Sequence, residues 1–392
     1  MNKNLVNEVA HPPIVDFKKL ARGIRPKNNV HFDMSQAVPW YPLFEPIRSK
    51  LIELVQLPEI EEYGPVPGIS ALRSHIAFHH PLSPTVTEDN IIITSGANHA
   101  IYTVFTTLFN PGEKIILLEP YYFNHEMALQ MLNFECLRYR LNANRDFQFD
   151  PEDLINFAKI NKAKGIVIVS PNNPTGVTFS ADSILKLLQL TKAIEIQVII
   201  DETYLAFDLT PQSNKKVWSE FLSTNLTIVG SFSKSLSLCG FRVGYLISKY
   251  ETIKQIMKVQ DTMIIAPCTL SMLAALHGLQ TCQVHMKEKL TELHEFQKIL
   301  MDCSARLKKF KFASVGVFFA YLRHPFDGLD ASKAALIIYE ETGILTLPGS
   351  AFGKDQEQYL RLAYCNLSTD SLKLACQSLI NFDSQLNFGV NI

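Results

Sequence analysis

The sequence predicts an α/β fold with a large domain, built on a mainly parallel sheet flanked by helices, and a smaller α+β domain. Between about Asn90 and Tyr250, short β-branched runs alternate with longer amphipathic stretches, the pattern of parallel strands joined by helical crossovers. Several of those runs are apolar throughout, as expected of strands that helices cover on both faces. After about His285 the pattern changes to one long helix, then a strand and a further helix.

The predicted sheet rests on a series of β-branched and apolar runs. In chain order, the strand candidates are Ile91–Thr94, Lys114–Leu118, Gly165–Val169, Gln197–Asp201, Leu226–Gly230 and Arg242–Ile247. The stretches between them predict helices, for example at Ala97–Phe109 and at Ala181–Thr191, where Ser180 is a candidate N-cap. Ligands of such sheets bind at the carboxyl ends of the strands, so the polar residues that follow each strand define the expected site.

The two ends of the chain differ from this central pattern. The first residues form an irregular arm with prolines at Pro39, Pro42 and Pro46, which leads into a helix at 47–55. The C-terminal part predicts a helix that extends to Phe310 and then a strand and a helix. We therefore expect an arm (1–45) that contributes to the small domain, a large cofactor-binding domain (46–285) and a small C-terminal domain (286–392), with the last strand at Ala313–Leu322 and the last helix near 331–341.

Composition favours a small-molecule partner. The chain has 392 residues, of which 47% are hydrophobic, and its 37 Lys and Arg nearly balance its 38 Asp and Glu, for a formal charge of -1. That balance gives no broad field to attract nucleic acid. The cysteines (136, 239, 268, 282, 303, 365 and 376) are scattered without a C-x-x-C pair, which favours reduced thiols. Because we see neither a signal-peptide pattern at the start nor an apolar run near the roughly 20 residues of a membrane span, we expect a cytoplasmic protein.

Three strand ends carry candidate binding groups. Ser95-Gly96-Ala97 follows the first strand and opens a helix, so its backbone N–H groups suit a phosphate, although a tight turn is the simpler interpretation. The segment 170–176 (S-P-N-N-P-T-G) is a rigid loop that holds Asn173, or else an ordinary turn. Asp201 ends an apolar strand, where it is either a functional carboxylate or a cap for the next turn.

A fourth strand end adds a lysine. Lys234 follows the run Leu226–Gly230 within Ser231-Phe232-Ser233-Lys234-Ser235, and Arg242 comes eight residues later. A lysine among small residues between apolar strands is expected to be desolvated, which lowers its pKa and frees the amine for imine formation. The serines and the guanidinium of Arg242 are suited to a phosphate group.

Taken in order, these motifs resemble one enzyme family. The ordered set S-G-A, P-N-N-P-T-G, D-E-x-Y, S-x-x-K and G-x-R-x-G resembles the class I/II aminotransferases of fold type I, and the match extends from about Tyr63 to Arg361. Each motif is common alone, whereas the ordered combination is specific. The resemblance implies a seven-stranded, mainly parallel sheet in the large domain and pyridoxal 5'-phosphate as cofactor.

Carried over position by position, the resemblance also implies roles for the motif residues. Lys234 would hold the cofactor as a Schiff base and move the substrate proton, and Asp201 would keep the ring nitrogen protonated. The remaining cofactor contacts would be Asn173 and Tyr204 at the phenolic oxygen, Tyr122 on the ring face, and Gly96, Ala97, Ser231 and Arg242 at the phosphate.

Three further residues bear on substrate and assembly. Arg361, in Y-L-R-L-A-Y, matches the arginine that holds the substrate α-carboxylate, and Asn173 is also expected to bind substrate. Tyr63 matches a tyrosine that reaches the phosphate of the neighbouring subunit, which implies a homodimer with shared active sites. The arm around Trp40 borders the substrate pocket in the family, but here it lacks the usual glycine, so the substrate does not follow from the resemblance.

These implications predict amino-group transfer from an L-amino acid to a 2-oxo acid by a ping-pong route. The alternatives are another reaction of the same cofactor, such as that of a β-lyase or an oxidase, and a non-catalytic cofactor-binding protein. Two other patterns are set aside. His75 and His79 lack the glutamate and third ligand of a metal site, and Gly349–Lys354 is one residue too short for a phosphate-binding P-loop.

Overall fold

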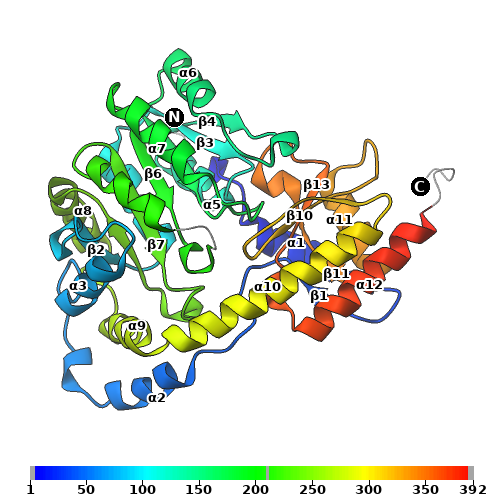
Figure 1. Ribbon diagram of the computed structural model, residues 1–392, viewed down its shortest axis with the longest axis horizontal. Coiled ribbons are helices and arrows are strands. Elements are labelled where there is room, and N and C mark those ends of the chain that lie inside the picture. Colours follow the sequence, from blue (N-terminus) through cyan, green and yellow to red (C-terminus); the bar gives the residue numbers. More distant parts are fainter. Residues whose placement is uncertain (1–4, 209–211, 387–392) are drawn as a thin grey trace.

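The computed structural model describes residues 5–208 and 212–386, and its largest element is a sheet of seven strands. The strand order in that sheet is β2-β8-β7-β6-β5-β3-β4 (Figure 1). Strand β8 is antiparallel to both of its neighbours, and the other pairs are parallel. The strands are β2 (Ile91–Thr94), β3 (Lys114–Glu119), β4 (Glu135–Arg140), β5 (Gly165–Val169), β6 (Gln197–Asp201), β7 (Leu226–Ser231) and β8 (Gly244–Ile247).

Alternate residues of each central strand enter two separate apolar cores. In β5, Ile166 and Ile168 pack in one core and Val167 packs in the other, because successive side chains point to opposite faces of a sheet. Helices α4 (Ala97–Leu108), α5 (Phe123–Met131) and α8 (Tyr250–Ile264) contribute to the core that contains Val167. The opposite core receives α6 (Pro151–Asn161) and α7 (Ala181–Lys192). Two-sided burial explains why these strands are apolar throughout.

A second sheet lies at the other end of the molecule, beyond the long helix α10 (Gln283–Arg306), which runs beside α12 (Thr369–Gln385) in Figure 1. Its strand order is β12-β13-β10-β9, all antiparallel. The N-terminal arm joins this part, since β1 pairs in parallel with β11 and α1 contacts α11. The elements here are α1 (Pro13–Ala21), β1 (Phe32–Asp33), β9 (Lys311–Val315), β10 (Ala320–Arg323), α11 (Ala331–Thr342), β11 (Ile344–Leu345), β12 (Leu347–Pro348) and β13 (Tyr359–Leu362).

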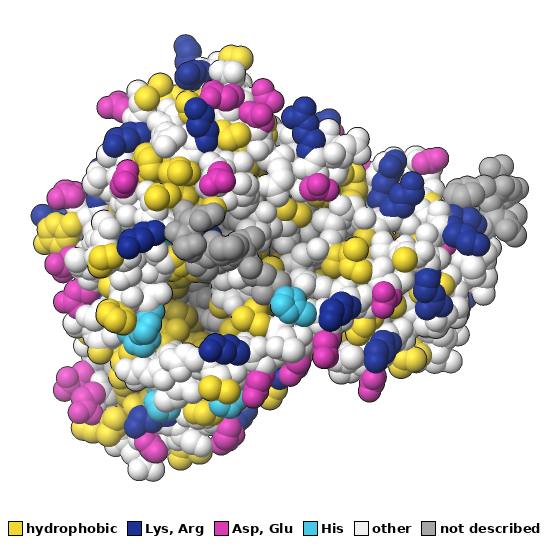
Figure 2. All heavy atoms as spheres, viewed as in Figure 1, with side chains coloured by type: hydrophobic (Ala, Val, Ile, Leu, Met, Phe, Trp, Pro, Cys, Tyr) yellow, Lys and Arg dark blue, Asp and Glu magenta, His cyan; other side chains and the backbone are white. Residues whose placement is uncertain are grey.

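Helices α2 (Glu45–Leu54), α3 (Ser70–His79) and α9 (Thr269–Thr281) complete the described α-helices and pack together beside the large sheet. On the face shown in Figure 2, Lys and Arg side chains are interspersed with Asp and Glu side chains, and no patch of one charge dominates. Within the described residues, no helix combines the length and the hydropathy that crossing a bilayer requires.

The structure corrects two sequence predictions about strands and adds one strand that was not predicted. The single strand expected at Ala313–Leu322 is two strands, β9 and β10, because Gly316 donates its N–H to the carbonyl of Phe319 (3.0 Å) and closes a turn between them. Strand β8 begins at Gly244 and not at Arg242, whose φ of 52° is left-handed and cannot continue a strand. The edge strand β4 has no counterpart among the strand candidates, since its sequence, E-C-L-R-Y-R, is half charged.

Candidate active site

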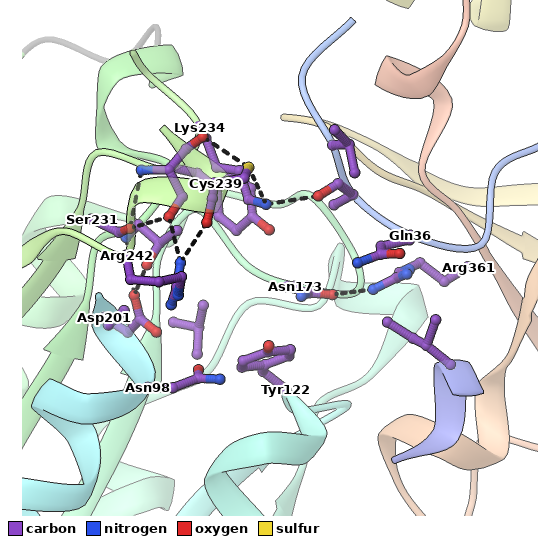
Figure 3. A pocket seen from close by; sticks show the side chains of 18 residues that line it. Gln36, Asn98, Tyr122, Asn173, Asp201, Ser231, Lys234, Cys239, Arg242 and Arg361 are labelled. Carbon is purple, nitrogen blue, oxygen red and sulfur yellow. Dashed lines mark hydrogen bonds between the residues drawn. The ribbon is translucent and has the colours of Figure 1, made fainter. Parts of the chain in front are cut away.

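A cavity of about 280 Å³ lies where the carboxyl ends of β5, β6 and β7 face the arm and β13. Figure 3 shows side chains from these separate elements pointing into it. Most of the residues singled out from the sequence line this cavity: Ala97, Tyr122, Asn173, Asp201, Tyr204, Ser231, Lys234, Arg242 and Arg361.

Lys234 follows β7 and extends toward the arm. Its Nζ donates a hydrogen bond to the carbonyl oxygen of Ala37 (2.7 Å) and lies 3.8 Å from Cys239 Sγ (Figure 3). Burial is the main cause that lowers the pKa of Lys234, and the charges of Arg242 and Arg361 also lower it. A lowered pKa leaves more of the amine neutral near pH 7 than in an exposed lysine, which is the state needed to attack a carbonyl carbon.

One end of the cavity is built to receive an anion. Arg242 Nη1 donates to Ser233 Oγ (3.4 Å), and the hydroxyl of Ser231 donates to the same oxygen (2.9 Å). Ala97 begins α4, whose first-turn N–H groups have no partner within the helix. Gly96 precedes it with φ 81°, and a Cβ at that position would lie 2.5 Å from Arg242 Nη2. A glycine is therefore required for the guanidinium to approach the helix N-terminus.

Asp201 is the last residue of β6, and the residue is only 3% exposed. Its Oδ1 accepts hydrogen bonds from the N–H (3.0 Å) and the hydroxyl (2.6 Å) of Thr203, so the carboxylate does organise the turn that follows, as the capping interpretation expected. Its other oxygen, Oδ2, lies 3.2 Å from Nε2 of His125 on α5, although neither ring nitrogen of His125 has a hydrogen-bond partner in the described structure. Asp201 also lines the cavity, so capping accounts for only one of its two oxygens.

Arg361 lies on β13 at the opposite side of the cavity from the anion-binding end, and it is 1% exposed. Its guanidinium lies between the rings of Phe319 and Phe352, 5.0 Å from each centroid. It donates to Asn173 Oδ1 (3.1 Å) and to the carbonyl of Ser35, whereas its Nε has no partner. Burial lowers the pKa of Arg361 to about 10, so it stays cationic at neutral pH. A buried cation whose recorded acceptors are neutral is prepared to bind a carboxylate.

Two tyrosines complete the walls. The hydroxyl of Tyr122 accepts a hydrogen bond from Asn124 Nδ2 (2.8 Å), and its ring stands edge-on to His125 with centroids 5.3 Å apart. Tyr204 packs against Phe318 and Phe319, and burial raises its pKa well above the ordinary value of 10. Its hydroxyl therefore remains protonated and able to donate a hydrogen bond.

Two predicted residues lie away from the cavity. Trp40 turns toward α10, where its Nε1 donates to Glu292 Oε2 (2.5 Å) and its ring packs on Phe296, because an indole is best buried where its N–H finds an acceptor. The arm reaches the cavity instead through Gln36, Ala37 and Val38. Tyr63 is 84% exposed and is not among the residues that line the cavity of its own chain.

The sequence interpretation missed several residues of the site. Gln36, Asn98 and Cys239 line the cavity beside residues that had been singled out. His125 had no sequence signal, since only the packing of α5 against the end of β6 brings it to Asp201.

With the geometry established, comparison with known proteins identifies the family. A model for aminotransferases of class I and II matches residues 32–379. The chain belongs to this family. Among curated relatives, it is 26% identical over 387 residues to the aspartate aminotransferase of Sulfolobus acidocaldarius, covering 94% of each chain. It is 25% identical to that of Thermotoga maritima, covering 97% of this chain and 98% of the relative.

Solved structures share the fold of this aminotransferase. The aspartate aminotransferase of Thermotoga maritima superposes with a TM-score of 0.86 at 24% identity, over 98% of this chain and all (100%) of that one. The enzyme of Thermus thermophilus with maleate gives 0.85 at 20% identity, over 97% and 99% of the two chains. The fold is that of the type I pyridoxal-phosphate enzymes.

The chain is an aminotransferase that depends on pyridoxal 5'-phosphate and moves the amino group of an L-amino acid to a 2-oxo acid in two half-reactions. The residues of the cavity fit that cofactor. The anion cradle at Gly96 and Arg242, the buried carboxylate of Asp201 and the buried amine of Lys234, whose pKa is lowered, match its phosphate, ring nitrogen and aldehyde in chemical type.

Proposed function

We propose that Lys234 links this aminotransferase covalently to its cofactor and that Arg361 holds the α-carboxylate of every substrate. The observation that carries the proposal is that both cations face one cavity, Lys234 from the loop after β7 and Arg361 from β13, and that one arm segment contacts both. The carbonyl of Ser35 accepts from Arg361 and the carbonyl of Ala37 accepts from Lys234. A substrate whose carboxylate is held by Arg361 then has its Cα toward Lys234 Nζ, which removes the Cα proton as a base.

The other residues orient the bound groups. Gly96, Ala97, Ser231 and Arg242 hold the phosphate through N–H, hydroxyl and guanidinium donors. When bound, the cofactor supplies an aldehyde carbon for the amino group and a ring that accepts the electron pair of the broken Cα–H bond. The carboxylate of Asp201 pairs with the ring nitrogen, and Asn173 and Tyr204 donate hydrogen bonds to the phenolic oxygen. The ring of Tyr122 stacks on the face of the cofactor.

We also propose a homodimer with shared sites and a cytoplasmic location. Support for the dimer is the exposed side chain of Tyr63, outside its own cavity, where it is free to enter a neighbouring one. All seven cysteines are free, as favoured in a reducing compartment. The pairing of β1 with β11 supports a division into an arm (1–45) that belongs with the small domain (286–392) and a large domain (46–285).

The test is a single half-reaction of the holoenzyme with one amino acid. We expect one equivalent of oxo acid per active site and conversion of the cofactor to its amine form, without ammonia release or oxygen uptake. Borohydride reduction before peptide mapping should mark Lys234. Ammonia in stoichiometric amount would indicate a lyase, oxygen consumption an oxidase, and a label on another lysine would refute the assignment of Lys234.

A further inference from the structure

The side chain of Cys239 contacts the amine of Lys234 but has no part in the proposed function. Cys239 begins the short 3-10 helix Cys239–Phe241, five residues after the lysine, and it lines the cavity. Nζ of Lys234 donates a hydrogen bond to its sulfur across 3.8 Å (Figure 3). The thiol is therefore placed to act on the amine itself.

Two contacts of Cys239 fix the direction of its thiol. Its Sγ donates to the carbonyl oxygen of Ser233 (3.1 Å), so the S–H bond is engaged there and not with the lysine. Its own carbonyl accepts a hydrogen bond from Arg242 Nη1 (2.9 Å), which holds the main chain of Cys239. With its hydrogen engaged, the sulfur presents a lone pair to Lys234 and serves as an acceptor for the amine.

The main chain of Lys234 is held as well. The hydroxyl of Tyr41 donates to the carbonyl of Lys234 (2.6 Å), and the hydroxyl of Ser237 donates to the carbonyl of Tyr41 (3.0 Å). Tyr41 is buried, and its ring stacks on Phe44. Because the main chain is fixed at this point, the direction of the amine depends on the torsions of the lysine side chain and on the groups that Nζ contacts.

The two acceptors of Nζ determine where its lone pair points. A neutral amine has two N–H bonds and one lone pair, arranged tetrahedrally around nitrogen with the carbon substituent. The carbonyl of Ala37 (2.7 Å) and the sulfur of Cys239 both accept from Nζ. When both N–H bonds are engaged in this way, the lone pair occupies the one direction that remains. A base removes a proton along its lone pair, so these two acceptors orient the base.

We propose that Cys239 is a further catalytic residue, whose thiol and the carbonyl of Ala37 together orient the lone pair of Lys234 whenever its amine is not bonded to the cofactor. The inference rests on the proposed function, because it takes Lys234 as the base. The lone pair of Nζ forms the new N–H bond to the Cα proton, and the electron pair of the broken C–H bond stays with the substrate and the bound cofactor. Cys239 neither gains nor loses a proton.

The first test measures the amine in the cofactor-free full chain, without turnover. Burial is the main cause that lowers the pKa of Lys234, and the contact with Cys239 opposes it by raising that pKa. Cys239→Ala should therefore lower the pH midpoint of reductive methylation of Lys234, measured with formaldehyde and cyanoborohydride. Cys239→Ser, whose hydroxyl also accepts a hydrogen bond, should return the midpoint toward that of the wild type.

The control for this test is Cys136→Ala. Cys136 is half-buried like Cys239 but lies on β4, so its loss should leave the Lys234 midpoint unchanged. A Cys239→Ala midpoint equal to or above that of the wild type would overturn the inference.

The second test measures proton transfer in the holoenzyme, with the amino acid that reacts fastest in the half-reaction test and with its α-deuterated form. Cys239→Ala should slow the maximal rate of the half-reaction by about 2- to 10-fold, the range expected for one hydrogen bond. Its half-saturating concentration should not change, and its primary isotope effect should be at least as large as that of the wild type. Cys239→Ser should keep most of the rate.

The outcomes separate the two proposals. A slower Cys239→Ala enzyme with a smaller isotope effect would mean that another step is impaired and would overturn the role of Cys239. Wild-type rates in Cys239→Ala, in a protein that borohydride labels at Lys234, would also remove only this role. If borohydride labels a different lysine in the wild type, the proposed function and this inference both fail.

Discussion

Arg361 on β13 donates a hydrogen bond to the side-chain oxygen of Asn173, in the loop after β5, across 3.1 Å. This contact joins the small sheet to the large one at the cavity, in the place where a substrate carboxylate would bind. A buried guanidinium that meets only neutral oxygens is costly to the ligand-free protein and useful once an anion arrives. The effect of Arg361 on the stability of the ligand-free protein and its effect on carboxylate binding can be measured separately.

Replacing Arg361 by Met should raise the midpoint of thermal unfolding of the ligand-free protein. The change removes a buried cation and keeps apolar contact with Phe319 and Phe352. The same variant should lose about 2–5 kcal/mol of binding for every carboxylate substrate, whatever its side chain. Arg323→Met, an exposed arginine on β10, is the control and should alter neither quantity appreciably. An Arg361→Met protein that melts earlier would mean that its lost hydrogen bonds outweigh the cost of the buried charge.

The Lys234 amine should lose its proton at lower pH than an exposed lysine. Burial lowers its pKa, so in the cofactor-free protein reductive methylation of Lys234 should show a midpoint below 10.5 when measured by mass spectrometry across pH. Between pH 10.5 and this lowered pKa, the unfolded chain binds a proton that folded Lys234 does not, so the Lys234 contribution to folding becomes less favourable as pH falls from 10.5 toward the lowered pKa. A midpoint at or above 10.5 for Lys234 would contradict the prediction.

Asp201→Asn should lower kcat by about 10²–10³-fold, the range found when one preorganised electrostatic group is removed. Cofactor binding should persist in part, because the phosphate cradle and Lys234 remain. The matched control is Asp330→Asn, since Asp330 also accepts a backbone N–H (2.8 Å, from Lys333) but caps α11 away from the cavity. The measurement is the steady-state kcat of each variant relative to that of the wild type. Equal, small effects of both changes would leave Asp201 as a structural cap.

Mixing two inactive variants should restore activity if the sites are shared between subunits. Tyr63→Ala is expected to weaken cofactor binding in the neighbouring site, and Lys234→Ala removes the covalent link in its own site. A hybrid dimer of the two has one site with both residues intact, so a 1:1 mixture should recover about a quarter of wild-type activity after subunit exchange. Each variant incubated alone is the control. A mixture no more active than its components would place Tyr63 outside the partner's site.

Local sequence patterns were sufficient for the central strands and for the motif residues at their ends. The limits predicted for β2, β5 and β6 agree with the structure, since burial on both faces favours apolar residues within each strand, and polar residues lie at or directly after its end. Strand β4 was not predicted because it lies at the edge of the sheet, where a strand need not be apolar. The turn between β9 and β10 was not predicted because it contacts a loop that is distant in sequence: the N–H of Val317 donates to the carbonyl of Gly176 (2.9 Å).

The sequence by itself thus determined the fold class, the order of the motifs and the types of group that can bind a phosphorylated cofactor. Tertiary structure alone decided that Trp40 faces Glu292 while Gln36 faces the cavity, and that His125 meets Asp201. It also decided that two phenyl rings enclose Arg361. The physical reason is the range of the interactions: periodicity and capping act over a few residues, whereas burial, pKa and the shape of a pocket depend on side chains that only folding brings together.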